Sequence, residues 1–100
     1  MAVHIVKEDD NIVYKISGVV DLYTEKAIRK EILNSLPKDY ESVILDMEET
    51  KNIDSAGIGM LIYLNNYFKK DGRNFALRSI QHSLMKVFQR GLFEKLFKIL

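Results

Sequence analysis

Residues Asp54–Gly59, with the sequence DSAGIG, combine a carboxylate, a hydroxyl and two glycines directly before a long apolar segment. Asp and Ser are both favoured at helix N-termini, where their side-chain oxygens accept hydrogen bonds from free backbone N–H groups. Glycines there permit a tight turn and close packing of the helix. The residue types alone therefore favour a structural role, with Asp54 or Ser55 capping a helix.

A second group of residues with chemical potential is acidic. Asp9 and Asp10 follow the first apolar segment and Asp46 follows a later one, which superficially resembles the Mg²⁺-binding carboxylates of a response-regulator receiver. A receiver needs a helix after its first acidic pair, whereas Asn11–Ser17 alternates like a strand. We therefore expect Asp9 and Asp10 to lie in a hairpin turn and reject the receiver interpretation.

Catalytic and metal-binding patterns are missing from the sequence. His4 and His82 have no cysteine partners and no HExxH spacing, no Walker-type phosphate loop is present, and Ser55 lacks a nucleophile-elbow pattern. With no cysteines, a disulfide framework and a thiolate metal site are also excluded. The sequence predicts a protein that is not an enzyme and needs neither cofactor nor metal.

Composition indicates a single domain over residues 1–100, since 100 residues with 47% hydrophobic content suffice for one core. The net charge of +1 argues against direct nucleic-acid binding. Residues 1–50 hold six Lys/Arg and eleven Asp/Glu (net −5), and residues 51–100 hold nine and three (net +6). We interpret this asymmetry as attraction within one domain. No secretory signal and no membrane span are predicted, which is consistent with a cytoplasmic location.

Hydrophobic periodicity predicts the order β-β-α-β-α-β-α, with a last edge strand. Apolar alternation predicts a hairpin whose second strand is closed by Gly18. Asp21 or Thr24 can cap a first helix that runs to Leu36 and is ended by Pro37. Ser83 is the expected N-cap of the last helix, which Gly91 ends. The expected ranges are strands at 2–7, 12–17, 42–46, 74–78 and 97–100, helices at 24–36, 55–70 and 83–91, and a loop at 47–54.

Strands joined through helices favour parallel pairing with right-handed crossovers. If the strands at 12–17, 42–46 and 74–78 are parallel, the segments Gly18–Tyr23, Met47–Gly57 and Ser79–His82 all emerge at one edge of the sheet. In open α/β sheets that edge commonly carries the functional site.

The segment Asp54–Gly59 resembles the Asp-Ser-(Ser/Thr/Ala)-Gly-(Leu/Ile)-Gly motif of STAS domains in bacterial anti-sigma factor antagonists. The segment Val43–Asp46, with Asp54 eight positions after Asp46, is similar to the strand and loop that precede the motif. Gly18–Asp21 is similar to the turn after the family's second strand, although Val19 stands where the family often has an acidic residue. The chain also ends where many members continue into another helix.

This resemblance implies a single α/β STAS-like domain, with a mixed sheet of four to five strands packed with three to four helices. It also implies a partner-switching function. Unphosphorylated protein would sequester an anti-sigma factor that is also a serine kinase, freeing a sigma factor for transcription. That kinase would phosphorylate Ser55, and a serine phosphatase would reset the switch. Because the loops meet at one edge of the predicted sheet, we expect the partner-binding residues to be Asp21, Asn52, Asp54, Ser55 and Gly57, with Ile58 included if it is not buried.

Two questions stay open at this point. The first is whether the domain switches at all, because related STAS domains serve as non-switching partner subunits in transport or sensory complexes. The second concerns the apolar C-terminal residues, which could form a docking surface but more often complete a core. These residues are Phe88, Leu92, Phe93, Leu96, Phe97 and Ile99.

Overall fold

The computed structural model describes residues 2–100, and its first feature is the expected hairpin. Strands β1 (Ala2–Glu8) and β2 (Asn11–Val20) pair antiparallel, with Val3 opposite Ile16. Asp9 and Asp10 form the turn, and Asp9 adopts a positive φ of 56°. The strand after the acidic pair thus confirms the argument against a receiver fold.

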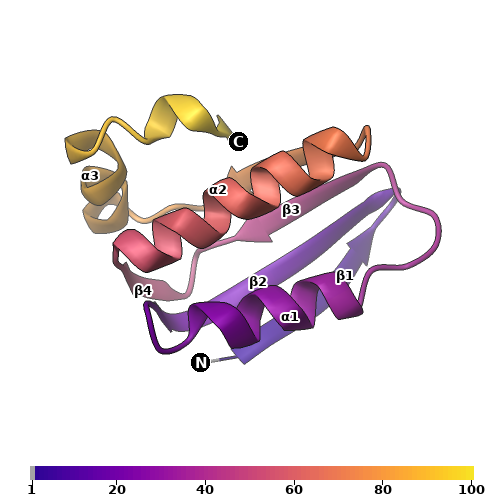
Figure 1. Ribbon diagram of the computed structural model, residues 1–100, viewed down its shortest axis with the longest axis horizontal. Coiled ribbons are helices and arrows are strands. Elements are labelled where there is room, and N and C mark those ends of the chain that lie inside the picture. Colours follow the sequence, from indigo (N-terminus) through magenta and orange to yellow (C-terminus); the bar gives the residue numbers. More distant parts are fainter. Residues whose placement is uncertain (1) are drawn as a thin grey trace.

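The remaining elements complete a mixed six-stranded sheet in the order β1-β2-β3-β5-β6, with β4 paired to the end of β2 (Figure 1). The pair β1 and β2 is antiparallel and the other described pairs are parallel, which confirms the predicted parallel pairing of β2, β3 and β5. In chain order, the helices and strands after β2 are α1 (Glu25–Asn34), β3 (Ser42–Asp46), β4 (Thr50–Ile53), α2 (Ser55–Lys70), β5 (Asn74–Arg78), α3 (His82–Arg90), the 3-10 turn η1 (Glu94–Leu96) and β6 (Lys98–Ile99).

Four predicted boundaries were wrong. Strand β2 does not close at Gly18 but continues to Val20, because its last residues pair with β4. Residues 50–53, expected in a loop, form β4, so the sheet has six strands rather than four to five. Helix α1 ends at Asn34, because Ser35 takes a non-helical conformation before Pro37 is reached. Helix α3 starts at His82 with Gln81 as its N-cap residue, so Ser83 lies inside the first turn instead of capping it.

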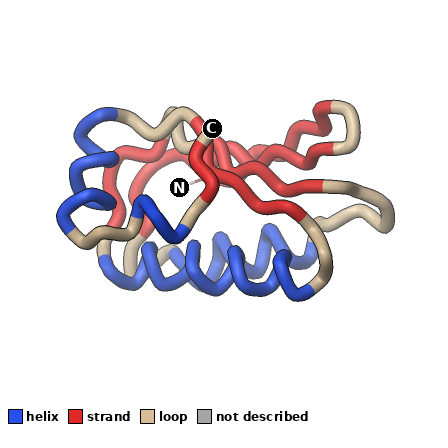
Figure 2. The backbone as a smooth tube through the Cα atoms, turned by 90° about the horizontal axis from the view of Figure 1, so that it is seen from above, coloured by secondary structure: helices blue, strands red, loops and turns tan. Residues whose placement is uncertain are grey.

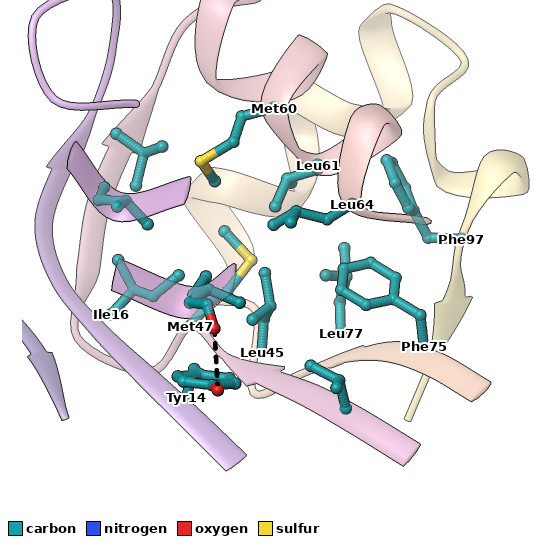
Figure 3. Packing of buried hydrophobic residues seen from close by; sticks show 14 of the residues in the cluster. Tyr14, Ile16, Leu45, Met47, Met60, Leu61, Leu64, Phe75, Leu77 and Phe97 are labelled. Carbon is teal, nitrogen blue, oxygen red and sulfur yellow. Dashed lines mark hydrogen bonds between the residues drawn. The ribbon is translucent and has the colours of Figure 1, made fainter. Parts of the chain in front are cut away.

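Helices α1 and α2 contact each other and lie together on one face of the sheet (Figure 2). The core beneath them is apolar, and Figure 3 shows Met60, Leu61 and Leu64 of α2 pointing toward Leu45 and Leu77 of the sheet. Tyr14 is buried as well, and its hydroxyl donates a hydrogen bond to the Ile32 carbonyl at 3.2 Å, drawn as the dashed line. This bond satisfies a polar group that would otherwise be costly to bury.

The apolar C-terminal residues divide between core and surface. Phe88 and Phe97 are buried and contact each other edge to face, which confirms the core interpretation for these two. Leu92 and Leu96 are exposed and contribute little to the core.

Candidate functional site

The start of α2 lies against the carboxyl ends of β2 and β4. The Asp54 N–H donates to the Val20 carbonyl at 3.2 Å. A Cβ atom at Gly57 would lie 2.4 Å from the Val20 carbonyl oxygen and 2.5 Å from Ile53 Cγ1. Since such contacts are too short for any side chain, glycine at position 57 is what lets α2 approach the sheet this closely.

The Asp54 side chain performs two tasks at this junction. It is the N-cap residue of α2, with Oδ1 accepting from the Gly57 N–H at 2.9 Å. Its Oδ2 accepts from the Leu22 N–H at 3.1 Å, although Leu22 lies in the loop after β2. One carboxylate therefore holds the β2–α1 loop beside the first turn of α2.

The β2–α1 loop is itself held together by Asp21 and Thr24. Asp21 Oδ1 accepts from the N–H groups of Tyr23 at 2.9 Å and Thr24 at 3.1 Å. The Thr24 hydroxyl donates to the Val19 carbonyl at 2.8 Å. These bonds leave the side chains of Leu22 and Tyr23 outside, with exposed fractions of 66% and 89%.

Ser55 is the first residue of α2, and its side chain is exposed. Among the described residues, its hydroxyl has no hydrogen-bond partner. Asp54 alone caps the helix, so the two capping candidates from the sequence are resolved in favour of Asp54. The Ser55 hydroxyl is consequently free to meet another molecule.

The structure brings Asp21, Asn52, Asp54 and Ser55 to one edge of the sheet, as the expected parallel strands required. Gly57 and Ile58 are buried, Ile58 with only 2% exposure, so we exclude both from any partner surface. Leu22 and Tyr23 were missed by sequence reasoning. The signal that could have found them is a pair of apolar residues directly after Asp21 in a predicted loop.

The segment Ser79–His82 reaches the same edge but contacts a different loop. The Gln81 side-chain amide donates to the Glu48 carbonyl, in the connection between β3 and β4. No hydrogen bond or ion pair joins this segment to Ser55 among the described residues, so we leave it out of the candidate site.

Within residues 2–100, no group of three or more His, Asp or Glu side chains is placed to hold a metal ion. No helix in the same range is long and apolar enough to cross a membrane.

Comparison with known proteins defines the family. The family model of the STAS domain matches residues 2–100, and the chain belongs to this family. The fold is similar to an anti-sigma factor antagonist from Mycobacterium paratuberculosis, with a TM-score of 0.84 and 16% identity over 98% of this chain and 83% of the other.

Two further solved structures share the fold. The anti-sigma factor antagonist SpoIIAA in its unphosphorylated form has a TM-score of 0.71 and 19% identity, over 99% of this chain and 87% of the other. A sulfate transporter family protein from Wolinella succinogenes has a TM-score of 0.79 and 20% identity, over 94% of this chain and 79% of the other. The structures that share the fold therefore include anti-sigma factor antagonists and a sulfate transporter family protein.

Proposed function

We propose that this protein is a bacterial, cytoplasmic anti-sigma factor antagonist that works by partner switching. Its unphosphorylated form binds an anti-sigma factor serine kinase and frees a sigma factor, and phosphorylation of Ser55 ends that complex. A serine phosphatase restores the binding form. The observation that carries this proposal is an exposed Ser55 hydroxyl, at the first position of α2, beside an ordered loop with two exposed apolar side chains.

The phosphoryl transfer uses ATP bound by the kinase. The Ser55 Oγ attacks the γ-phosphorus, the bond from that phosphorus to the β–γ bridging oxygen breaks, and ADP leaves. The hydroxyl proton passes to a base of the kinase. This chain supplies only the acceptor, so it needs no nucleotide site of its own.

The phosphate would change the surface far more than the fold. It adds about −1.5 to −2 charge and three strong acceptors at pH 7. The helix N-terminus favours an anion, while the neighbouring Asp54 carboxylate repels it. We therefore expect Leu22 and Tyr23 to stay in place as apolar anchors, and binding to be lost by repulsion and desolvation at Ser55.

Asp21 is a poor position for testing this surface. From the sequence, reversing its charge should weaken kinase binding without lowering the melting temperature. We instead expect the reversal to lower the melting temperature as well, because the Asp21 carboxylate accepts hydrogen bonds from the N–H groups of Tyr23 and Thr24. Charge reversal at Asp21 would therefore disrupt the β2–α1 loop as well as change the charge of the surface.

The exposed residues Leu22 and Tyr23 give a cleaner test. Leu22→Ser and Tyr23→Ser should each weaken binding to the anti-sigma kinase, measured by calorimetry, and leave the melting temperature within error of wild type. Leu96→Ser, which alters an exposed leucine of η1 away from Ser55, is the control. Undiminished affinity in both loop variants would place the interface elsewhere.

The alternative function is a non-switching STAS partner subunit in a transport or sensory complex. The similarity in fold to the sulfate transporter family protein supports this alternative. Ser55→Asp distinguishes the two proposals, since it should weaken binding in a switch and leave it unchanged in a constitutive scaffold.

A further inference from the structure

The outer face of α2, beyond its first two turns, carries an ordered aromatic pair. The rings of Tyr63 and Tyr67 are stacked, with centroids 6.4 Å apart and an interplanar angle of 21°. The Arg29 guanidinium of α1 lies 5.2 Å from the Tyr63 ring centroid. Both tyrosines stay substantially exposed, at 46% and 41%. Large rigid rings of this kind are enriched at protein interfaces, where they bury apolar area at a low cost in conformational entropy.

The surroundings of this pair are cationic. A shallow depression of about 670 Å³ is lined by Tyr63, Asn66, Tyr67, Lys69 and Lys70, without a carboxylate among them. The nearby acids already have partners, because Asp71 contacts Arg73 at 3.4 Å and Glu25 contacts Arg29 at 3.8 Å. The two lysines are therefore left to attract negative charge from outside the chain.

The shape of the depression indicates the size of its partner. All five lining residues come from one helix, so the surface is open and cannot enclose a small molecule as a ligand pocket does. A nucleic acid is disfavoured because the whole chain has a net charge of only +1.

A second copy of this chain is also disfavoured. Another depression is lined by Asp10, Asp39 and Glu41 together with Lys7 and Arg73, and docking that depression onto α2 of a second copy would join two different surfaces. Contacts between unlike surfaces propagate into rings or open chains instead of closing as a two-fold dimer.

We propose that Tyr63, Tyr67, Lys69 and Lys70, which we name the distal α2 face, dock an acidic, amphipathic segment of a partner protein. Carboxylates of that segment would meet the two lysines, and an apolar side chain would lie across the tyrosine pair. Along the helix, Tyr63 is about 12 Å and Lys70 about 22 Å from Ser55. The distal α2 face is thus distinct from Ser55, and its occupation does not depend on the proposed phosphorylation.

The test is an NMR titration of the ¹⁵N-labelled chain with a synthetic amphipathic helical peptide that has Glu on its polar face and Leu on its apolar face. The proposal predicts saturable amide shifts confined to residues 63–70 and the adjoining part of α1. A peptide of the same length with Lys in place of Glu should bind much more weakly, and added salt should reduce binding of the acidic peptide.

Two substitutions and a control sharpen the result. Lys70→Glu should weaken the acidic peptide about fivefold or more, because attraction becomes repulsion. Lys51→Glu, at an exposed lysine of β4, makes the same charge change elsewhere and should alter affinity little. Tyr67→Ser should also weaken binding, with its fold checked by melting because Tyr67 packs edge-on against Phe68 at 5.2 Å.

Several outcomes would overturn the proposal. Absence of saturable shifts, shifts centred on another face, or equal loss in Lys70→Glu and Lys51→Glu would each do so. Tighter binding of a single-stranded oligodeoxythymidylate at this face would assign it to nucleic acid, and concentration-dependent self-association lost in Lys70→Glu would assign it to a second copy.

Discussion

At the scale of single residues, the Asp54 carboxylate joins two segments that are 32 positions apart in the chain. Removing it in Asp54→Ala should lower the free energy of unfolding by about 1–2 kcal/mol, because the cap of α2 and the Leu22 hydrogen bond are lost together. Urea denaturation measures the first effect, and faster hydrogen exchange at the Leu22 amide reports the second. Asp54→Asn keeps one acceptor oxygen and should cost less. An unchanged Leu22 exchange rate in Asp54→Ala would show that the loop is held by other contacts.

Two glycines in the same helix should respond to alanine in opposite directions. Gly57→Ala should destabilise the protein by about 1–3 kcal/mol, since the new Cβ would meet the Val20 carbonyl oxygen and force α2 outward. At Gly59, an added Cβ would have no neighbouring heavy atom of the described residues within 4 Å, so Gly59→Ala should stabilise by up to about 1 kcal/mol through helix propensity. Urea denaturation of both variants compares them, and effects of the same sign would contradict the close-approach role of Gly57.

Sequence reasoning predicted the position of Ser55 at the start of a helix, because capping residues and apolar periodicity are local signals. It could not decide whether Ile58 is exposed, because α2 is apolar almost all round and its pattern does not show which side faces the sheet; the structure buries Ile58. Exposure of Leu22 and Tyr23 was equally hidden, since it depends on hydrogen bonds to Asp21 and Asp54 that form only in the folded chain.

At the scale of elements, β4 shows why a short strand escapes prediction. Only Thr50 and Ile53 of its four residues are buried, so its apolar alternation is broken. The strand forms by pairing with the end of β2 from Gly18 onward, and the register shifts between Gly18, which has a φ of 93°, and Val19. This tertiary pairing has no local sequence signature, whereas the other strands carry apolar runs of their own.

The end of α3 offers a prediction about stability. Phe93 N–H donates to the Phe88 carbonyl at 2.8 Å and Leu92 N–H to the Gln89 carbonyl at 3.1 Å, the two bonds of a Schellman motif. This places Leu92 at a φ of 59°, where glycine is preferred, and its side chain is 71% exposed. Leu92→Gly should therefore raise the free energy of unfolding by about 1 kcal/mol. Thermal melting measures the change.

The neighbouring Gly91 is the matched control for this prediction. A Cβ there would lie 2.1 Å from the Phe93 ring, so Gly91→Ala should destabilise the protein. The expectation of a more stable Leu92→Gly variant would be contradicted by a loss of stability. Such a loss would show that packing of the leucine side chain outweighs the strain of its positive φ.

At the scale of the whole molecule, Arg78 ties three strands together. Its guanidinium contacts Glu8 of β1 at 3.0 Å and Asp46 of β3 at 3.2 Å, although β2 and β3 lie between β1 and β5 in the sheet. Both ion pairs join the acidic first half of the chain to the basic second half. The charge asymmetry of the sequence is thus used in part for contacts within the domain, as expected.

The ion pair between Arg78 and Glu8 predicts a pH dependence. The hydrogen bonds from Arg78 hold the pKa of Glu8 below its ordinary value of 4.5, despite the opposing effect of desolvation. Because the folded pKa is the lower one, the stabilisation is present above pH 4.5 and is lost as pH falls below it through the folded pKa. Glu8→Gln should flatten the decline of unfolding free energy in this acid range, measured by urea denaturation. Glu41→Gln, at an exposed glutamate, is the control, and identical acid profiles for Glu8→Gln and wild type would contradict the assignment.

Apart from β4, the order of elements and the parallel pairing of β2, β3 and β5 follow from apolar periodicity and chain connectivity, and the structure agrees with them. The placement of α1 and α2 on the same face of the sheet was not predicted. It depends on how each crossover packs, which the residues of a single helix do not specify.

The most direct test of the proposed switch is phosphoryl transfer itself. The chain, its anti-sigma kinase partner and Mg-ATP are incubated together, and intact-mass spectrometry with peptide mapping counts and locates the phosphates. The proposal predicts one phosphate on wild type, located at Ser55, and none on Ser55→Ala, which should still fold and bind the kinase at a cost in stability of at most about 1 kcal/mol. Phosphorylation of Ser55→Ala, or stable kinase binding by the fully phosphorylated wild type, would contradict it.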